Sequence, residues 1–369
     1  MTHATMLTTV AALALSAGAA LAEGETIGFS QIGSESGWRA AETTLTRSQA
    51  EERGYQLQFS DAQQRQENQI AAIRSFVAQG VDAILLAPVV ATGWDSVLQE
   101  AAEAEIPVVL LDRQVDSADD LYLTAVGSDL VHEGEVAGQW LVDEVAGEPC
   151  RIVELQGTTG SSPAIDRKTG FENAIAGHDN LEIVRSQTAD FTRARGKEVM
   201  ESFLQAEGGG ADICALYAHN DYMAVGAIQA IKEAGLAPGT DILVVSIDAV
   251  PDIFQAIAAG EANATVELTP NMAGPAFDAA RTWATDTARA GRDRPARSLK
   301  GMPMLLSIRS LTKLFPGTRA LDDVDLDIAA GQVHALLGEN GAGKSTLIKC
   351  LTGAYRRDGG TVMLDGAPI

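Results

Sequence analysis

Residues 83–113, AILLAPVVATGWDSVLQEAAEAEIPVVLLDR, decide the fold of this chain. A short apolar run at Ala83–Ala87 is followed by a helical pattern at about 93–105, and then by a second apolar run at Val108–Leu111. Short apolar runs bounded by polar turns are typical of buried strands. The stretch therefore predicts a strand, a helix and a second strand.

The same alternation continues on both sides of this stretch. Further strands are expected at Thr26–Gln31, Tyr55–Phe59, Leu121–Val126, Ile152–Gln156, Leu181–Arg185, Ile213–Tyr217 and Ile242–Ile247. Helical patterns lie between them, at about 35–53, 65–80, 130–146, 161–177, 192–207, 220–235 and 251–259. Strict alternation predicts an α/β fold with parallel sheets covered by helices on both faces. Because the strands are too many for one small sheet, we expect two lobes.

The first residues are typical of an export signal. The chain is apolar or small from Leu7 to Ala19, and Ala20-Leu21-Ala22 forms the small-x-small pattern of a cleavage site before Glu23. The apolar run is too short to span a bilayer. We therefore expect residues 1–22 to be a signal peptide and the protein to be periplasmic. The alternative is a buried N-terminal helix.

The composition limits the classes of function. The chain has 369 residues, of which 46% are hydrophobic and 21% charged, so it can bury the cores of two or three domains. A formal charge of -23 and a pI near 4.5 argue against nucleic acid as a partner. We find no Ser-His-Asp order, HExxH motif or His-Cys cluster, and therefore expect no catalysis on the ligand and no metal. We expect His132, His178 and His219 in surface or loop positions.

Polar side chains follow several of the expected strands. They are Asp112 and Arg113, then His219, Asn220 and Asp221, then Asp248, and the loop Ser34–Arg39 that contains Trp38. Open parallel sheets bind ligands outside the carboxyl ends of their strands. A guanidinium or a carboxylate can bind two adjacent hydroxyls, and an aromatic face can cover C–H groups, so this set suits a sugar.

Each of these residues also has a simpler interpretation. Asn220 or Asp221 can cap the following helix, Asp112 and Arg113 can form a local ion pair, and Trp38 can be a core residue. Their joint placement at strand ends favours the binding site.

Two of the three cysteines precede expected strands at equivalent positions. Cys150 and Cys214 would lie at the same edge of one sheet if those strands are parallel neighbours, which permits a disulfide in an oxidising compartment. Two unpaired buried thiols are the alternative. Cys350 is expected to be an inert helix residue.

A different motif appears near the C-terminus. Gly338-Glu339-Asn340-Gly341-Ala342-Gly343-Lys344-Ser345 is a phosphate-binding loop, in which backbone N–H groups face the phosphates, Lys344 reaches the terminal phosphates and Ser345 offers a hydroxyl to Mg²⁺. With its flanking strand and helix, this motif indicates a nucleotide-binding segment.

Residues 25 to about 290 resemble periplasmic sugar-binding proteins of the ribose- and galactofuranose-binding type. The resemblance is carried by GFSQIGSESGWRAAE, IPVVLLDRQVD, AIDRKTGF, ADFTR, YAHNDYMAVGAIQAIKEAG and SIDAVPDIFQAI. It implies two Rossmann-like lobes, a type I periplasmic binding protein that closes on one monosaccharide by hinge motion, with a membrane permease and ATPase subunits as partners. We expect lobe 1 at about 23–128 and 270–290 and lobe 2 at about 129–269.

The resemblance also implies the ligand contacts, motif by motif. They are Glu35, Ser36, Trp38, Arg39, Asp112, Arg113, Arg167, Phe191, Asn220 and Asp248. Arg167 and Phe191 rest on the resemblance alone. Ribose-binding relatives carry a glutamine near the last hinge, where this chain has Glu267, a departure that argues against ribose as the ligand.

After a junction at 291–303, residues 304–369 resemble the first part of a sugar-import ABC transporter ATPase. The resemblance assigns nucleotide contacts to Phe315, which would stack on adenine, and to the loop residues Gly338, Gly341, Gly343, Lys344, Ser345 and Thr346. The family's glutamine loop, signature sequence, Walker B strand and switch histidine do not appear in these residues. We therefore expect an incomplete P-loop fragment that arose by fusion of neighbouring genes, with weak ATP and Mg²⁺ binding at most and no ATPase activity.

Three classes of function are thus compared. The sequence favours the sugar-binding component of an ABC importer, without a cofactor. The alternatives are an ATP-binding transporter subunit, which ATP binding would reveal, and a sugar-responsive sensor, which would carry a helix-turn-helix where this chain has a signal peptide.

Overall fold

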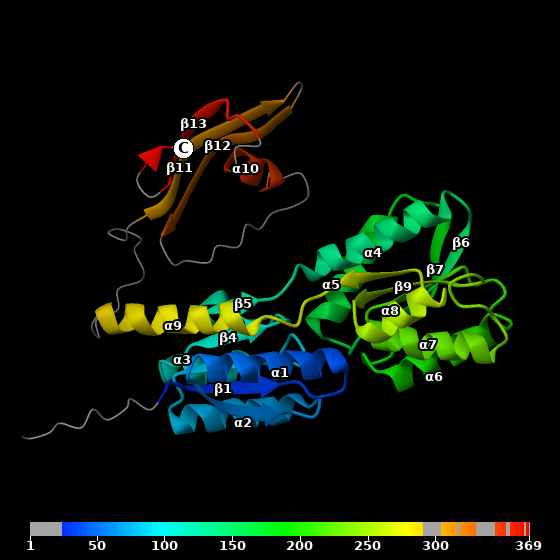
Figure 1. Cartoon of the computed structure of the whole chain (residues 1–369), viewed down its shortest axis with the longest axis horizontal. Helices are drawn as coiled ribbons and strands as arrows, with labels where there is room; N and C mark the ends of the chain where they lie inside the picture. The colour runs from blue at the N-terminus through cyan, green and yellow to red at the C-terminus, as the bar shows by residue number, and fades with distance from the viewer. Residues whose placement is uncertain are drawn as a thin grey trace, which may run out of the picture.

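The computed structural model describes residues 24–290, 304–315, 318–329, 344–351, 355–364 and 367–368. The expected signal peptide at 1–22, the junction at 291–303 and the glycines of the phosphate loop lie outside the described residues. Figure 1 shows the two lobes side by side, with helices on both faces of each sheet.

Lobe 1 is built on a five-stranded parallel sheet with the order β2-β1-β3-β4-β5. Its strands are β1 (Thr26–Gln31), β2 (Gln56–Asp61), β3 (Ala83–Leu86), β4 (Val108–Leu111) and β5 (Thr124–Val126). The helices of this lobe are α1 (Gly37–Glu52), α2 (Gln66–Gln79), α3 (Asp95–Glu103), the short 3-10 helix η1 (Asp119–Leu121) and α9 (Ala273–Ala290). The central strands β3 and β4 are buried at every position, as expected for strands covered on both faces.

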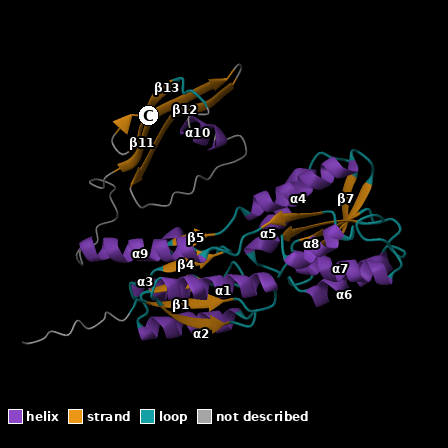
Figure 2. Cartoon of the chain, viewed as in Figure 1, coloured by secondary structure: helices purple, strands orange, loops and turns teal. Residues whose placement is uncertain are grey.

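Lobe 2 repeats the design with the strand order β10-β9-β8-β6-β7. Its strands are β6 (Cys150–Gln156), β7 (Leu181–Thr188), β8 (Ala215–Ala218), β9 (Leu243–Asp248) and β10 (Ala264–Glu267). The helices are α4 (Leu130–Val145), α5 (Ser162–Ile175), α6 (Arg193–Ala206), α7 (Asp221–Glu233) and α8 (Pro251–Ala258). Figure 2 shows the same layering of helix, sheet and helix in both lobes.

The α4–α5 pair packs with its backbones in close contact. A Cβ atom added to Gly134 would lie 2.2 Å from the carbonyl oxygen of Arg167, and one added to Gly170 would lie 1.9 Å from that of Val131. Only glycine permits this approach. It brings the side chains of α4 within reach of those at the start of α5.

Within residues 24–290, two segments carry the chain between the lobes. Residues 127–129 join β5 to α4, and residues 268–272 join β10 to α9. Both segments leave the carboxyl ends of strands, so the two crossings flank the edge at which both sheets end.

The fold class predicted from the sequence is confirmed, with differences at particular elements. The expected strand at Leu121–Val126 begins only at Thr124, because Asp119–Leu121 forms a 3-10 turn. Strand β10 and helix α9 extend the architecture beyond the elements predicted from periodicity.

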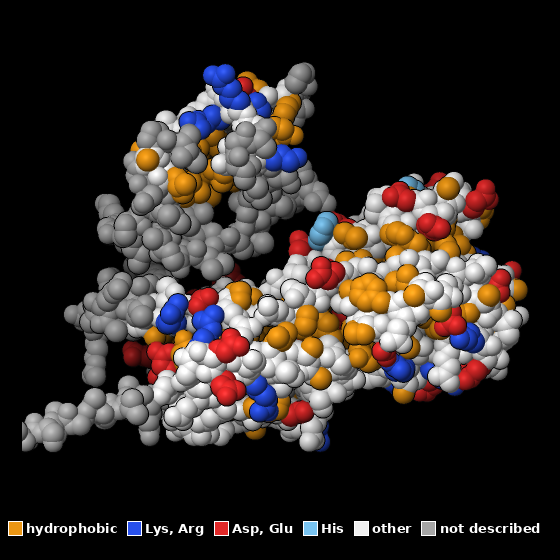
Figure 3. Space-filling model, in the orientation of Figure 1, with side chains coloured by type: hydrophobic (Ala, Val, Ile, Leu, Met, Phe, Trp, Pro, Cys, Tyr) orange, Lys and Arg blue, Asp and Glu red, His pale blue; other side chains and the backbone are white. Residues whose placement is uncertain are grey.

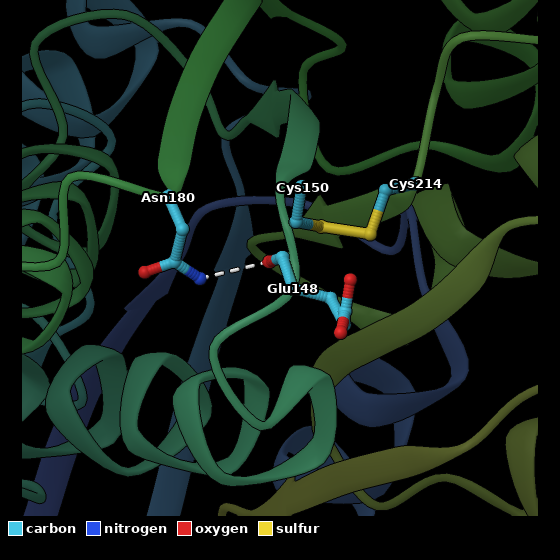
Figure 4. Close-up of a disulfide and its surroundings, with 4 residues drawn as sticks. All are labelled: Glu148, Cys150, Asn180 and Cys214. Carbon is cyan, nitrogen blue, oxygen red and sulfur yellow. Dashed lines mark hydrogen bonds between the residues drawn. A yellow bond between two sulfur atoms is a disulfide. The ribbon is translucent and has the colours of Figure 1, made fainter.

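The structure contains a disulfide between Cys150 and Cys214, with an S–S distance of 2.05 Å (Figure 4). Cys150 begins β6 and Cys214 directly precedes the neighbouring strand β8. Beside it, Asn180 Nδ2 donates a hydrogen bond to the carbonyl oxygen of Glu148 at 2.8 Å. The disulfide therefore joins two adjacent strands at their amino ends, opposite the edge where ligands are expected.

The C-terminal segment forms a separate antiparallel sheet with the order β12-β11-β13-β14. Its elements are β11 (Met304–Phe315), β12 (Thr318–Ala329), α10 (Lys344–Leu351), β13 (Gly359–Leu364) and β14 (Ala367–Pro368). Ile308, Leu311, Leu347 and Val362 form its small core, and Cys350 is buried on α10 as a free thiol. Among all described helices, none combines the length and apolarity needed to cross a membrane.

Figure 3 shows acidic (red) and basic (blue) side chains interspersed over the visible face of both lobes. The large hydrophobic side chains exposed on the lobes all belong to lobe 2, namely Val136, Ile165 and Phe254.

Candidate functional site between the lobes

A cleft lies between the lobes. All of the ligand contacts expected from the sequence line it, which are Glu35, Ser36, Trp38, Arg39, Asp112, Arg113, Arg167, Phe191, Asn220 and Asp248. Pro163 and Leu268 complete the lining. Glu267, the residue at the position where relatives carry glutamine, is exposed and does not line the cleft.

The first part of the lobe 1 wall is the loop before α1 and the first turn of that helix. Ser36 is the N-cap, since its hydroxyl accepts a hydrogen bond from the backbone N–H of Arg39 at 3.2 Å. Trp38 is 6% exposed and its Nε1 donates to the carbonyl oxygen of Leu268 at 2.8 Å. Trp38 is therefore both a core residue and a cleft residue, so the two interpretations of its role hold together.

Arg39 is surrounded by carboxylates. Its guanidinium donates to Glu42 at 2.8 Å and to Asp112, and its Nε lies 3.7 Å from Glu35 Oε1. Burial acts to lower the pKa of Arg39, but Asp112, Glu42 and Glu35 outweigh it and raise the pKa above its usual range. The side chain is thus held as a fixed cation.

Asp112 and Arg113 lie where β4 ends. Asp112 has a φ of 62°, in the left-handed region, which turns the chain into the cleft. Arg113 Nε lies 3.7 Å from Asp112 Oδ2, one of its terminal nitrogens donates to the carbonyl oxygen of Val89 at 3.0 Å, and its guanidinium lies 5.1 Å from the ring centroid of Phe191 in lobe 2. Burial and repulsion from Arg39 lower the pKa of Arg113. The expected local ion pair is present and lines the cleft.

Arg167 is the central cation of the lobe 2 wall. From the second turn of α5 it donates to Glu133 Oε2 at 2.8 Å and to the carbonyl oxygen of His219 at 2.5 Å, and it lies 3.6 Å from Asp248 Oδ1. Burial acts to lower its pKa, but Glu133 and Asp248 outweigh it and raise the pKa. Arg167 is 3% exposed, so its orientation is fixed by these acceptors.

Phe191 and Asn220 form the next part of this wall. Gly157 makes room for the phenyl ring, because a Cβ atom at that position would lie 1.8 Å from Phe191 Cζ. Asn220 Oδ1 caps α7 by accepting from the backbone N–H of Met223 at 3.0 Å, and its Nδ2 donates to the carbonyl oxygen of Phe191 at 3.3 Å. Capping and cleft lining therefore occur in the same side chain.

Asp248 ends β9 and also lines the cleft. Burial raises its pKa well above the usual range, although Arg167 acts in the opposite direction. Asp221, one residue after Asn220, is outside the lining. It accepts hydrogen bonds from Ser246, Thr265 and the backbone N–H of Val250, at 2.6, 2.8 and 2.8 Å, and burial raises its pKa to about 6.

Three buried polar atoms of the lining have no hydrogen-bond partner among the described residues. They are Glu35 Oε2, Asp112 Oδ1 and Arg113 Nε. Buried polar groups are normally paired, because leaving one unpaired costs on the order of 1–3 kcal/mol. Two acceptors and one donor in one cleft are suited to a ligand rich in hydroxyl groups, each of which both donates and accepts.

The lobes contact each other across the cleft. The backbone N–H of Gly37 in lobe 1 donates to the hydroxyl of Tyr222 in lobe 2 at 2.8 Å. On the other side, the backbone N–H of Gln114 donates to the hydroxyl of Ser162 at 2.9 Å, and that of Ala91 to the carbonyl oxygen of Gly160 at 2.8 Å. The structure therefore has the closed arrangement of the lobes.

His219 lies in the loop between β8 and α7, as expected, but not on the surface. Its side chain is fully buried, with Nε2 3.0 Å from Glu154 Oε1 and Nδ1 accepting weakly from the backbone N–H of Gly157 at 3.4 Å. Burial lowers the pKa of His219, so the ring is neutral at pH 7. His132 and His178 are exposed, as expected. The sequence signal that was missed is that His219 directly follows β8, whose positions are all buried.

The comparisons with known proteins agree with this geometry. Residues 27–281 match the family described as periplasmic binding protein domain. The chain belongs to this family. Residues 321–369 match the ABC transporter family, so the C-terminal resemblance is also confirmed.

Among curated relatives, the galactofuranose-binding protein YtfQ of Escherichia coli (strain K12) is 65% identical over 72% of this chain and 84% of its own length. The ribose import binding protein RbsB of the same organism is 34% identical over 61% of this chain and 73% of its own length. Over 68 C-terminal residues, a putative ribose/galactose/methyl galactoside import ATP-binding protein of Albidiferax ferrireducens is 59% identical, which covers 18% of this chain and 14% of that protein.

Two solved structures extend the comparison. A galactofuranose-binding protein has 65% identity and a TM-score of 0.70, covering 71% of this chain and 89% of its own. The binding protein of the arabinose ABC transporter of Shewanella sp. ANA-3, bound to α- and β-L-arabinofuranose, has 56% identity and a TM-score of 0.69, covering 73% and 88%.

The residues expected to contact nucleotide are only partly described. Phe315 packs edge-on against Tyr355, with ring centroids 5.3 Å apart, and Lys313 Nζ lies 5.3 Å from the Phe315 ring centroid. Phe315 is 37% exposed. Thr346 lies half-buried on α10, which begins at Lys344 and Ser345, whereas Gly338, Gly341 and Gly343 lie outside the described residues.

Proposed function

We propose that the protein is the periplasmic substrate-binding component of a sugar ABC importer. It binds one neutral monosaccharide between its lobes and delivers it to a membrane permease and its ATPase subunits. The observation that carries this proposal is the cleft lined by arginines, carboxylates, an amide and aromatic rings from both lobes. Relatives that bind galactofuranose and arabinofuranose support a furanose as the ligand.

The charge of the lining supports a neutral ligand. Three arginines and three carboxylates face the cleft, since Arg39, Arg113 and Arg167 are matched by Glu35, Asp112 and Asp248. The cations are already paired with carboxylates, so a phosphate or a uronate would bring a further negative charge without a free cation. Adjacent sugar hydroxyls can instead donate hydrogen bonds to the carboxylates and accept them from the guanidinium groups.

Calorimetry on the purified chain tests this proposal. The panel is L-arabinose, D-galactose, D-fucose, D-ribose and galactose 6-phosphate, and ¹³C NMR of the bound sugar labelled at C1 reports the ring form. We expect the neutral hexose or pentose to bind as a furanose and the sugar phosphate not to bind. The proposal would be contradicted if the sugar phosphate bound tightly, or if none of the neutral sugars bound.

For the C-terminal segment, we propose that these residues bind nucleotide weakly and do not hydrolyse it. Phosphoryl transfer requires a residue that positions the attacking water and a carboxylate that helps to hold Mg²⁺, in addition to the phosphate loop. Residues 304–369 supply the loop and the aromatic Phe315. Absence of ATP turnover by a polypeptide of these 369 residues is the expected result.

A further inference from the structure

Glu133 connects a cleft arginine to a crossing between the lobes. It lies on α4, outside the cleft lining, and is 4% exposed. One oxygen, Oε2, accepts from Arg167 Nε at 2.8 Å, and the other, Oε1, accepts from the hydroxyl of Ser128. Ser128 lies in the crossing segment 127–129. One buried carboxylate therefore contacts both a residue of the cleft, Arg167, and a residue of the crossing segment.

The contact with Glu133 decides the orientation of the Arg167 side chain. The guanidinium has a carbonyl acceptor in His219, a carboxylate acceptor in Glu133 and a looser neighbour in Asp248 at 3.6 Å. If Glu133 is removed, the nearest remaining carboxylate is Asp248, which also lines the cleft. A buried charge that loses its partner is strongly destabilised unless it pairs with another charge. If Arg167 moved onto Asp248, these two cleft side chains would bind each other and not the sugar.

We propose that Glu133 is a positioning residue for ligand binding. It holds the Arg167 guanidinium in the orientation that meets the sugar and, through Ser128, fixes that orientation relative to the crossing segment. This inference rests on the proposed function, because it takes Arg167 to contact the sugar.

A double-mutant cycle tests the inference on the full chain, with L-arabinose and D-galactose as titrants. We expect Glu133→Ala to raise the Kd about tenfold or more, because a hydrogen bond to a charged group is lost. Ser128→Ala, at an exposed position, should raise it by a smaller factor. In an Arg167→Ala background both substitutions should change the Kd by less than about twofold, since residues that act through one another are not additive. A purely structural role would give the same factor in both backgrounds.

Two further variants separate positioning from folding. Glu133→Gln keeps an acceptor for Arg167 Nε and should restore most of the affinity lost in Glu133→Ala. Glu144→Ala, at an exposed position on the same helix, should leave the Kd unchanged. Thermal melting of each variant identifies any that does not fold, and Ser128→Ala and Glu133→Gln then carry the test.

The outcomes distinguish the inference from the proposed function. Full additivity of Glu133→Ala with Arg167→Ala would overturn the positioning role, and an unchanged Kd in Ser128→Ala would overturn the link to the crossing. An unchanged Kd in Arg167→Ala would remove Arg167 from the site and overturn the inference alone. Absence of sugar binding by the wild-type chain would instead overturn the proposed function.

Discussion

Closure of the lobes should depend on the absence of a side chain at Gly37, which contacts Tyr222 across the cleft. The Tyr222 hydroxyl accepts from the Gly37 backbone N–H across the cleft at 2.8 Å. A Cβ atom added to Gly37 would lie 2.2 Å from that hydroxyl oxygen but 3.4 Å from the ring carbon that carries it. Gly37→Ala should therefore hinder closure, and removal of the hydroxyl should relieve most of the collision.

The expected magnitudes follow from these distances. Tyr222→Phe removes one hydrogen bond that exists only in the closed arrangement, which is worth about 0.5–1.5 kcal/mol and corresponds to a rise in Kd of about 2–12-fold. Gly37→Ala should cost more, because a contact of 2.2 Å requires either the Tyr222 side chain to move, with loss of the same hydrogen bond, or the lobes to shift apart. The double variant should bind better than Gly37→Ala alone, since the remaining contact of 3.4 Å is tolerable.

Calorimetry with L-arabinose and D-galactose measures the affinities, and stopped-flow fluorescence of the tryptophans measures the dissociation rates. Both sugars should lose affinity by the same factor, because neither Gly37 nor Tyr222 lines the cleft. Tyr122→Phe is the matched control, since the hydroxyl of Tyr122 donates to Asp119 at 3.0 Å within lobe 1 and not across the cleft. Normal binding by Gly37→Ala, or a double variant no better than the single one, would refute the reasoning.

Three further predictions concern other parts of the chain. Arg167→Ala should weaken sugar binding by about 1.5–3 kcal/mol, as calorimetry would show, because a charged donor is lost; unchanged affinity would remove it from the site. Cys150 and Cys214 should be found as a disulfide by mass spectrometry of unreduced protein, and replacing both by serine should cost up to about 4 kcal/mol of unfolding free energy for a separation of 64 residues; two free thiols would contradict this. The chain should show no ATP turnover that depends on Lys344, and truncation near Lys300 should leave sugar affinity unchanged. ATP turnover that is lost in Lys344→Ala, or weaker sugar binding after truncation, would show that the two parts act together.

The sequence predicted the fold wherever strands are buried on both faces. Strands β3 and β4 are continuous apolar runs, and their bounds were predicted to within one residue. Strand β10 was missed, because Ala264–Glu267 is a short edge strand that is only half-buried and carries no distinct apolar run. Burial by neighbours in space, rather than local pattern, makes it a strand.

The cleft could be predicted in part from strand ends. Asp112 and Asn220 follow β4 and β8, and Asp248 ends β9, so the topology alone brings them to one edge. Arg167 lies instead on the second turn of a helix, and only the resemblance indicated it. The bond from Trp38 Nε1 to Leu268 joins positions 230 residues apart, and no local pattern encodes such a contact.

The stability of lobe 2 in acid should depend on Glu154. This carboxylate is fully buried, accepts from Lys168 Nζ at 2.9 Å and from the hydroxyl of Ser186, and lies 3.0 Å from His219 Nε2. Burial acts to raise its pKa, but hydrogen bonds from His219, Ser186 and Lys168 outweigh it and lower the pKa from 4.5 to about 2. A carboxyl whose pKa is lower in the folded state stabilises the protein above its unfolded pKa, and that stability is lost as the pH falls toward the folded pKa.

For Glu154 this window runs from pH 4.5 down to about 2, and the shift corresponds to roughly 3 kcal/mol at neutral pH. His219 acts in the same direction at higher pH, because its pKa is lowered from 6.5 by burial and protonation therefore favours the unfolded state as the pH falls below 6.5. Urea unfolding between pH 7 and pH 3 should show Glu154→Gln less stable than the wild type at pH 7, with the difference reduced by about 2 kcal/mol at pH 3.

The matched control is Glu198→Gln on α6, an exposed carboxylate paired with Arg195 at 2.7 Å, which should change stability little at any pH. A difference between wild type and Glu154→Gln that stays constant from pH 7 to pH 3 would mean that Glu154 contributes through packing and not through its charge. Because the His219 carbonyl also accepts from Arg167 at 2.5 Å, loss of this buried pair should reach the cleft as well. Glu154→Gln is thus expected to weaken sugar binding at pH 7, whereas Glu198→Gln is not.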